Sequence, residues 1–192
     1  MRCLHCALVF VPPTLFLNSA EEKAEYDLHD NHPEDPGYRK FLSRIAEPLL
    51  ARLPTEGAKG LDFGCGPGPA LASMLEEAGC RVALYDIFYY PDQRVLNQHY
   101  DFITATEVFE HLHQPAAVIN RLWQCLVPGG CLAIMTKLVV DREAFSGWHY
   151  KNDPTHVIFF SRETFSWLAH KLDARIEFVG NDVIMLTRAG AK

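Results

Sequence analysis

The chain has 192 residues, enough for one hydrophobic core and a short appendage. Hydrophobic residues make up 48% of it and charged residues 22%, which is normal for a soluble globular domain. The net charge of −6 argues against a broad basic surface for nucleic acid, and no apolar stretch is long enough for a membrane-spanning helix. Six scattered cysteines suit a reducing environment better than a disulfide scaffold, so we expect a cytoplasmic location.

The first residues contain a C-x₂-C pair, Cys3 and Cys6, followed by the apolar run Ala7 to Val11. Such a pair before a strand resembles one knuckle of a zinc ribbon. A ribbon needs a second pair, and the other cysteines fall in or beside expected core elements. We therefore interpret residues 1–19 as an incomplete zinc-ribbon-like arm whose first knuckle is absent, and expect no complete zinc site in this chain. The alternative is two unused thiols in a frayed terminus.

Residues 20–59 are expected to form an N-terminal helical segment. Apolar residues recur at helical spacing between Tyr38 and Leu53, and Pro48 should kink or split this helix. Pro54 to Lys59 then leads into the first strand of the main domain, which we expect to span residues 60–192.

The most informative stretch runs from Gly60 to Asp86. A short apolar strand enters a turn with three glycines at alternate positions, Gly64, Gly66 and Gly68. A helical pattern follows, and a second apolar strand ends on the Asp86 carboxylate. Glycines let the backbone approach a ligand closely, and a carboxylate at the end of the second strand can accept hydrogen bonds from ribose hydroxyls.

Two classes of nucleotide cofactor fit this unit. A dinucleotide turn has the spacing G-x-G-x-x-G, whereas here the third glycine comes one residue early. The run Asp62 to Gly68 instead resembles the first motif of class I S-adenosylmethionine (SAM)-dependent methyltransferases. This resemblance extends from about Leu61 to the end of the chain, and it implies that SAM is bound by Asp62, Phe63, Gly64, Cys65, Gly66, Gly68, Asp86, Ile87, Thr106 and Glu107.

The resemblance also implies that residues 20–59 form a helical cap over the SAM pocket, and the alternative is that these helices only pack against the domain. The rest of the chain fits the same family with one departure. About fifteen residues separate Asp86 from the strand expected at Phe102 to Thr106, so the third strand must be very short and its helix missing or reduced. The acid that reads the adenine amino group in the family is therefore not identifiable. Near the end, two β-rich runs flank Gly180-Asn181, a hairpin signal. We expect an α/β fold, a doubly wound Rossmann-like methyltransferase sheet, mostly parallel with a C-terminal antiparallel hairpin.

Candidate catalytic residues follow the strand that ends near Thr106. Glu107-x-x-Glu110-His111 resembles a segment of ubiquinone-pathway O-methyltransferases and small-RNA 2′-O-methyltransferases, in which it lies beside the SAM sulfonium and can hold a divalent ion. His156 could reach the same pocket from beyond a long loop. We therefore consider Glu110, His111 and His156 as catalytic residues, and all three with Glu107 as ligands of Mg²⁺ or Mn²⁺. The alternative is that they cap a helix and bind backbone.

The segment Lys137 to Asp153 is long and irregular, and loops of this length in compact domains are usually functional. We expect it to form the acceptor side of the pocket, with Trp148 and Tyr150 either as walls or as core anchors.

These patterns predict transfer of the SAM methyl group to an unidentified acceptor, with oxygen favoured. A small-molecule acceptor is expected, while RNA and protein stay open, and the oligomeric state is not predicted. Two other functions remain: a catalytically silent SAM-binding partner module, and an NAD-dependent oxidoreductase.

Overall fold

The computed structural model describes residues 1–28, 32–54 and 57–190. The parts of the predicted ranges 20–59 and 60–192 that fall on residues 29–31, 55–56 and 191–192 lie outside this description. In chain order the elements are β1 Val9–Phe10, η1 Pro13–Leu15, α1 Ser19–Tyr26, α2 Pro36–Leu50, β2 Lys59–Phe63, α3 Ala70–Glu77, β3 Arg81–Tyr85, η2 Gln93–Asn97, β4 Tyr100–Thr106, η3 Phe109–His111, α4 Pro115–Gln124, β5 Leu126–Met135, α5 Arg142–Ser146, η4 His149–Asn152, β6 Ile158–Phe159, α6 Arg162–Leu172, β7 Ala174–Val179 and β8 Val183–Arg188.

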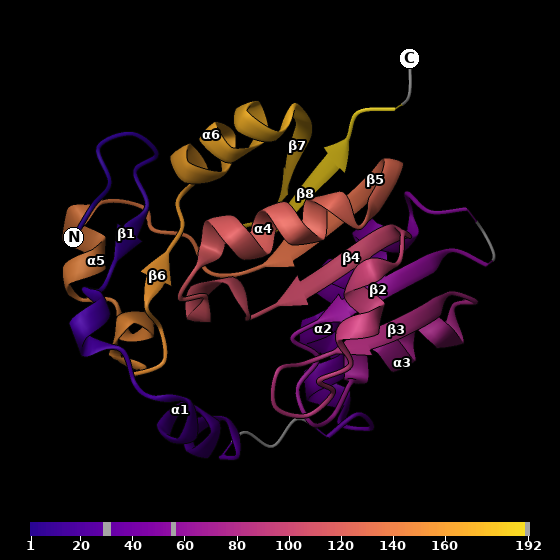
Figure 1. Ribbon diagram of the computed structural model, residues 1–192, viewed down its shortest axis with the longest axis horizontal. Helices are drawn as coiled ribbons and strands as arrows, with labels where there is room; N and C mark the ends of the chain where they lie inside the picture. The colour runs from indigo at the N-terminus through magenta and orange to yellow at the C-terminus, as the bar shows by residue number, and fades with distance from the viewer. Residues whose placement is uncertain (29–31, 55–56, 191–192) are drawn as a thin grey trace.

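Among the described residues, the main sheet has the strand order β3-β2-β4-β5-β8-β7 (Figure 1). The first four strands are parallel, and β8 runs antiparallel to both β5 and β7. The chain therefore has the predicted α/β fold with a mostly parallel sheet and a C-terminal antiparallel hairpin. Because the first four strands are parallel, their carboxyl ends share one edge of the sheet, where ligands bind in folds of this kind.

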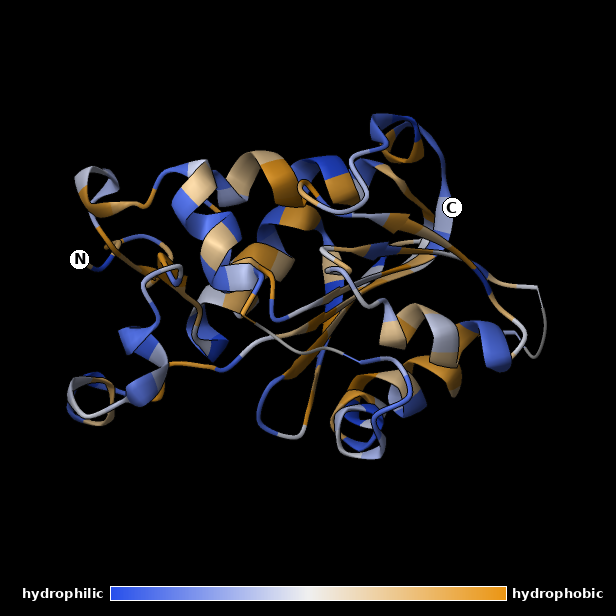
Figure 2. Cartoon of the chain, turned by 90° about the horizontal axis from the view of Figure 1, so that it is seen from below, coloured by the Kyte–Doolittle hydropathy of each residue, from blue (hydrophilic) through white to orange (hydrophobic). Residues whose placement is uncertain are grey.

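Two apolar layers enclose the sheet. On one face, α2 and α3 contribute Leu42, Ile45 and Leu75 to a buried cluster. On the other face, α4 and α6 contribute residues such as Leu122 and Phe165. Figure 2 shows hydrophobic residues concentrated along the strands, with hydrophilic residues on outer helix surfaces and loops. The central strands β2, β4, β5 and β8 are thus mostly buried on both faces, whereas the edge strands β3 and β7 are partly exposed.

The region after Asp86 is shortened, as the sequence predicted, but it contains a 3₁₀ helix where a very short strand was expected. This helix, η2, is fastened to its neighbours through its backbone carbonyls. Tyr100 donates its hydroxyl to Val95 O at 2.8 Å, and the Cys125 thiol lies 3.0 Å from Leu96 O. Because η2 replaces a strand and helix, β3 forms the edge of the main sheet.

Residues 1–19 pack against the main domain. Antiparallel pairing of β1 with β6 places Val9 opposite Phe159, and the Val11 amide donates to Val157 O at 2.8 Å. The arm therefore joins the segment that directly follows His156.

Local sequence signals explain most helix ends. Ser161 forms the predicted N-cap of α6, and Gly79 follows α3 with the positive φ of 89° that favours glycine. The prediction that Pro48 splits the helix after Tyr38 is wrong, because α2 runs unbroken through it. Pro48 lies in the last turn, so its missing amide removes one helix hydrogen bond and the helix continues for only two more residues.

The close contact between β2 and β4 gives a test of packing at the sheet centre. A Cβ at Gly60 would lie 2.1 Å from Cζ of Phe102, whose side chain is fully buried. Gly60→Ala should therefore lower the free energy of unfolding by about 1–3 kcal/mol, the usual cost of overpacking. Urea denaturation measures it. Gly147→Ala is the control, because nothing lies within 4 Å of its Cβ position, and equal stability of the two variants would contradict the packing.

Candidate active site

A large cavity lies at the carboxyl edge of the parallel strands. Its volume is about 1190 Å³, and its lining comes from the ends of β2, β3 and β4, from α1, α2 and α4, and from the 137–156 segment. A pocket for one small ligand typically measures roughly 300–1,000 Å³. This cavity therefore has room for a cofactor and a second molecule side by side.

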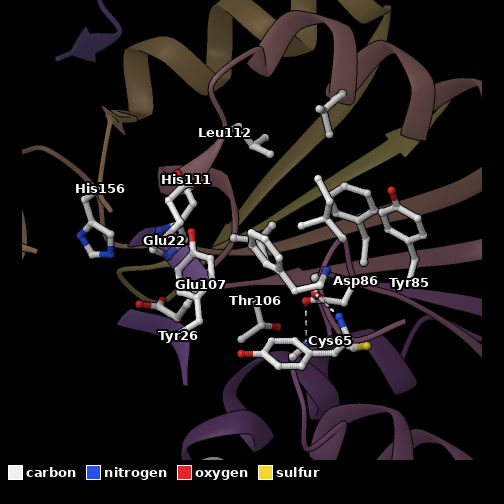
Figure 3. Close-up of a pocket in the computed structure, with 18 of the residues that line it drawn as sticks. Glu22, Tyr26, Cys65, Tyr85, Asp86, Thr106, Glu107, His111, Leu112 and His156 are labelled. Carbon is white, nitrogen blue, oxygen red and sulfur yellow. Dashed lines mark hydrogen bonds between the residues drawn. The ribbon is translucent and has the colours of Figure 1, made fainter. Parts of the chain in front are cut away.

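At one end of the cavity the glycine turn is fastened to the end of β3. The amides of Gly64 and Cys65 donate to Tyr85 O, and the Gly66 amide donates to Oδ2 of Asp86 at 3.1 Å (Figure 3). Gly64 and Gly66 have φ values of 73° and 63°, which glycine adopts without strain. The turn and the carboxylate therefore hold each other in place before any ligand arrives.

Asp86 also organises the loop that follows it. Its Oδ1 accepts hydrogen bonds from the amides of Phe88 and Tyr89 at 2.8 and 3.1 Å. The next residue, Ile87, is 68% exposed yet lines the cavity. An exposed apolar side chain beside a fixed carboxylate suits a nucleoside, whose base is apolar on its faces and whose ribose carries hydroxyl donors.

The structure brings most of the predicted cofactor residues to this cavity: Phe63, Gly64, Cys65, Gly66, Asp86, Ile87, Thr106 and Glu107 all line it. Asp62 does not. It lies beneath the turn with its side chain buried, and Thr104 donates to its Oδ1 at 2.7 Å. Burial raises the pKa of Asp62 to about 6. Gly68 is not in the lining either.

Thr106 stands between the two ends of the cavity (Figure 3). Among the buried side-chain oxygen and nitrogen atoms of the described residues, the one without a hydrogen-bond partner is Oγ1 of Thr106. A buried hydroxyl without a partner costs about 1–3 kcal/mol. Its position therefore indicates that a polar group of a ligand completes this part of the site.

Beyond the other end of the cavity the carboxylate of Glu110 is fully buried, and Glu110 is not in the cavity lining. It accepts hydrogen bonds from the hydroxyl of Tyr150 and from Thr136, the latter at 3.0 Å. Burial nevertheless raises its pKa. Tyr150 comes from the 137–153 loop. The sequence left open whether it is a wall of the pocket or a core residue, and it is both, since it lines the cavity and is buried.

Two imidazoles lie against this carboxylate. The rings of His111 and His156 are 4.7 Å apart in an edge-to-face arrangement, and both line the cavity. Nδ1 of His111 lies 3.2 Å from Thr155 O, and Nδ1 of His156 lies 2.6 Å from Tyr150 O. A carbonyl accepts only a proton donor, so each neutral ring carries its proton on Nδ1 and has Nε2 as its basic nitrogen.

The predicted catalytic and metal residues are therefore adjacent. One ligand atom each from Glu110, His111 and His156 lies within 4.8 Å of the others. Glu107 is linked to this group through the Tyr150 hydroxyl, which lies 3.1 Å from Glu107 Oε2. Glu107 has a φ of 50°, an unusual conformation for a residue other than glycine, of the kind that persists at functional sites.

Helix α1 covers this end of the cavity, and the sequence did not reveal its contacts. Tyr26 packs edge-on against His111 with ring centroids 5.3 Å apart, and Nε2 of His113 lies 2.7 Å from Oε1 of Glu22. These pairs are far apart in the chain, so no local pattern could have shown them. Trp148, by contrast, lies behind Tyr150 and packs on its ring.

The raised pKa of Glu107 can be tested by measuring how the free energy of unfolding depends on pH. Burial, and secondly the Glu110 carboxyl, raise the pKa of Glu107 from 4.5 to about 7. Between these pH values the folded protein keeps a proton that the unfolded chain releases, so the free energy of unfolding falls as pH rises. Glu107→Gln should make this fall smaller in urea titrations across the same range. The exposed Glu47→Gln should behave like the wild type, and an unchanged slope in Glu107→Gln would contradict the assignment.

Comparison with known proteins places this chain in a family. A family model described as a methyltransferase domain matches residues 38–177. The chain is 33% identical over 116 residues to trans-aconitate 2-methyltransferase of Methylobacterium radiotolerans, covering 48% of this chain and 43% of that protein. It is also 33% identical over 96 residues to the ubiquinone biosynthesis O-methyltransferase of Yersinia pestis, covering 38% and 39%. The chain thus spans about two fifths of the length of these relatives.

A solved structure shares the fold over nearly the whole chain. The 1,6-didemethyltoxoflavin-N1-methyltransferase of Burkholderia thailandensis, with 1,6-didemethyltoxoflavin and S-adenosylhomocysteine bound, aligns with a TM-score of 0.54 and 18% identity, covering 96% of this chain and 95% of that one. Together with the family model, which covers most of the chain, this result shows that the protein belongs to the class I SAM-dependent methyltransferases.

Proposed function

We propose that this protein transfers the methyl group of SAM to an oxygen atom of a small molecule. One observation carries the proposal: a single cavity joins the glycine turn and Asp86 to the imidazoles of His111 and His156. Thr106 lies between them, with its hydroxyl lacking a partner.

The cofactor end fits the nucleoside and amino-acid parts of SAM. Asp86 would accept hydrogen bonds from the ribose hydroxyls, and Ile87 would pack on the face of the adenine. The turn at Gly64 to Gly66 would face the methionine part. SAM supplies an electrophilic methyl group when bound, so the protein needs mainly to align it with the acceptor and exclude water. Such alignment can contribute on the order of 7–11 kcal/mol to lowering the barrier.

The other end supplies a base for a hydroxyl acceptor. Burial and the neighbouring His111 lower the pKa of His156, so this ring is neutral at neutral pH. Nε2 of either imidazole can accept the acceptor's proton as the oxygen attacks. The carbonyls at Nδ1 hold the rings in that tautomer, and the buried carboxylate of Glu110 stabilises the imidazolium that forms.

Several features support a small acceptor. The cavity beside the cofactor end is bounded by α1 and by the 137–153 loop. The ubiquinone relative is by name an O-methyltransferase, and the net charge of −6 offers little attraction for RNA.

No helix within the described part of the chain could cross a membrane. The free cysteines support the predicted cytoplasmic location.

A divalent cation at Glu110, His111 and His156 is a second candidate. Two imidazoles and a carboxylate, with ligand atoms within 4.8 Å of one another, form a donor set that suits a divalent transition metal. The three residues would hold the ion, and it would lower the pKa of a bound hydroxyl. Against it, both oxygens of Glu110 already accept hydrogen bonds, from Tyr150 and Thr136. Metal-free base catalysis therefore stands first.

Asp86 tests the cofactor end. Asp86→Asn keeps an oxygen for the amides of Phe88 and Tyr89 but removes the charge. We expect it to weaken binding of S-adenosylhomocysteine by about 1–3 kcal/mol, the range for a charged hydrogen-bond partner. Calorimetry measures the loss, and the exposed Glu76→Gln serves as the charge-matched control. Equal affinity of wild type and Asp86→Asn would refute the cofactor site, and tight binding of NAD by the wild type would favour an oxidoreductase.

His111 tests the catalytic end. With tritiated SAM and a panel of phenols, catechols and small polycarboxylates including trans-aconitate, we expect His111→Ala to lower turnover by about 10²–10⁴, the range for a general base. Cofactor affinity should stay near that of the wild type. His99→Ala, an exposed histidine, should retain activity.

The same assay separates the remaining functions. Turnover that survives a chelator agrees with a base, and turnover that is lost with the chelator and restored by Mg²⁺ or Mn²⁺ identifies the cation as essential. Wild-type activity in both His111→Ala and His156→Ala would refute both. Cofactor binding with no transfer to any acceptor on the panel would support a silent SAM-binding module.

A further inference from the structure

The ammonium group of Lys137 stands apart among the charged groups of the cavity. Within residues 1–28, 32–54 and 57–190 it makes no hydrogen bond and no ion pair, although Lys137 lines the cavity and is partly buried. The other carboxylate and arginine side chains of the lining each have a polar partner in the same ranges: Glu22, Asp86, Glu107, Asp153 and Arg121. A partly buried ammonium group without a counter-ion is unfavourable, so its position indicates that an anionic ligand group completes it.

Lys137 lies at the end of the cavity that contains the imidazoles. Its Nζ is 4.9 Å from the ring centroid of Tyr150. The same ring packs against His156 with centroids 4.2 Å apart, and its hydroxyl donates to Glu110. A single aromatic side chain therefore connects the ammonium group to the proposed base.

The ring of Tyr150 also holds the ammonium group in the absence of an anion. An aromatic face attracts a cation by roughly 0.5–2 kcal/mol, less than a charged hydrogen-bond partner provides. The nearest competitor for the charge is Glu107, whose pKa is lowered by Lys137, but burial outweighs this effect and raises that pKa to about 7. Near neutral pH much of Glu107 is thus protonated, and Lys137 stays available to a ligand.

We propose that Lys137 binds a carboxylate of the methyl acceptor, so that the acceptor is a small hydroxylated acid. This inference rests on the proposed function and names the class of its acceptor. A molecule with its carboxylate at Lys137 and its hydroxyl at Nε2 of His111 or His156 is held at two points. Two-point attachment fixes the hydroxyl beside the base and limits the orientations from which it can attack the methyl group.

Binding of acids to the cofactor-loaded protein tests the proposal without depending on turnover. The full chain is saturated with S-adenosylhomocysteine and titrated by calorimetry with protocatechuate, salicylate and malate, each paired with its uncharged amide. We expect at least one acid to bind more tightly than its amide. Lys137→Met and Lys137→Gln should weaken binding of that acid by roughly 10–100-fold, the range for a hydrogen bond to a charged group, and leave binding of the amide unchanged.

Two further variants control for charge and position. Lys137→Arg keeps the positive charge and should retain most of the affinity for the acid. Lys151→Met makes the same change of charge in the neighbouring segment at a residue outside the cavity lining, and should bind the acid like the wild type.

The carboxylate of the cofactor is the other anion that could meet Lys137, and a second titration separates it. The probes are S-adenosylhomocysteine and methylthioadenosine, which lacks the amino-acid part. Weaker binding of S-adenosylhomocysteine by Lys137→Met, with methylthioadenosine unaffected, would assign Lys137 to the cofactor and overturn the proposal. Acids that bind the wild type no better than their amides, or that bind Lys137→Met and Lys137→Gln as well as the wild type, would also overturn it.

These outcomes differ from those that refute the proposed function. Absence of S-adenosylhomocysteine binding by the wild type would refute both the function and this inference. Methyl transfer to uncharged hydroxyl compounds, at rates that Lys137→Met does not alter, would support the function and overturn the inference alone.

Discussion

The buried carboxylate of Glu110 is the constraint on which the active site depends. A buried carboxylate without partners costs several kcal/mol, so this site exists only while the hydroxyls of Tyr150 and Thr136 reach it. Thr136 follows β5 and Tyr150 comes from the 137–153 loop. The requirement for both donors therefore folds this loop over the end of the sheet. His156 is thereby brought beside His111.

At the cofactor end of the cavity, backbone amides rather than side-chain hydroxyls hold the key carboxylate, Asp86, in position. The Gly66 amide and the amides after Asp86 converge on one carboxylate, so the loop after β3 and the turn after β2 form a single unit. Since those amides are occupied within the protein, Asp86 is held rigidly where ribose hydroxyls would meet it. Preorganisation of this kind lowers the conformational entropy that the protein must lose when a ligand binds.

The sequence was informative wherever chemistry is local. The glycine turn, the carboxylate after the second strand and the hairpin at Gly180 each depend on a few adjacent residues, and the structure has all three. It was less informative where side chains meet across long distances. Nothing near Tyr150 indicated that its hydroxyl would bind Glu110, and the contact between Glu22 and His113 joins segments with no common pattern. The predicted split at Pro48 was wrong because α2 accommodates the loss of one amide donor close to its end.

The shortened region after β3 bears on how the base of a bound cofactor would be recognised. With η2 in place of a strand and a helix, Leu96 becomes part of the cavity wall together with Val118 and Arg121 of α4. In related methyltransferases this unit carries the acid that reads adenine, so under the proposed function recognition of the base would depend on packing against Ile87 and on polar groups of α4 and its preceding loop. Packing discriminates less than paired hydrogen bonds, because it leaves no buried polar group unpaired when the wrong base enters. The three backbone amides that hold Asp86 would fix the position of the ribose, which is common to nucleotide cofactors, and would leave discrimination between bases to this packing.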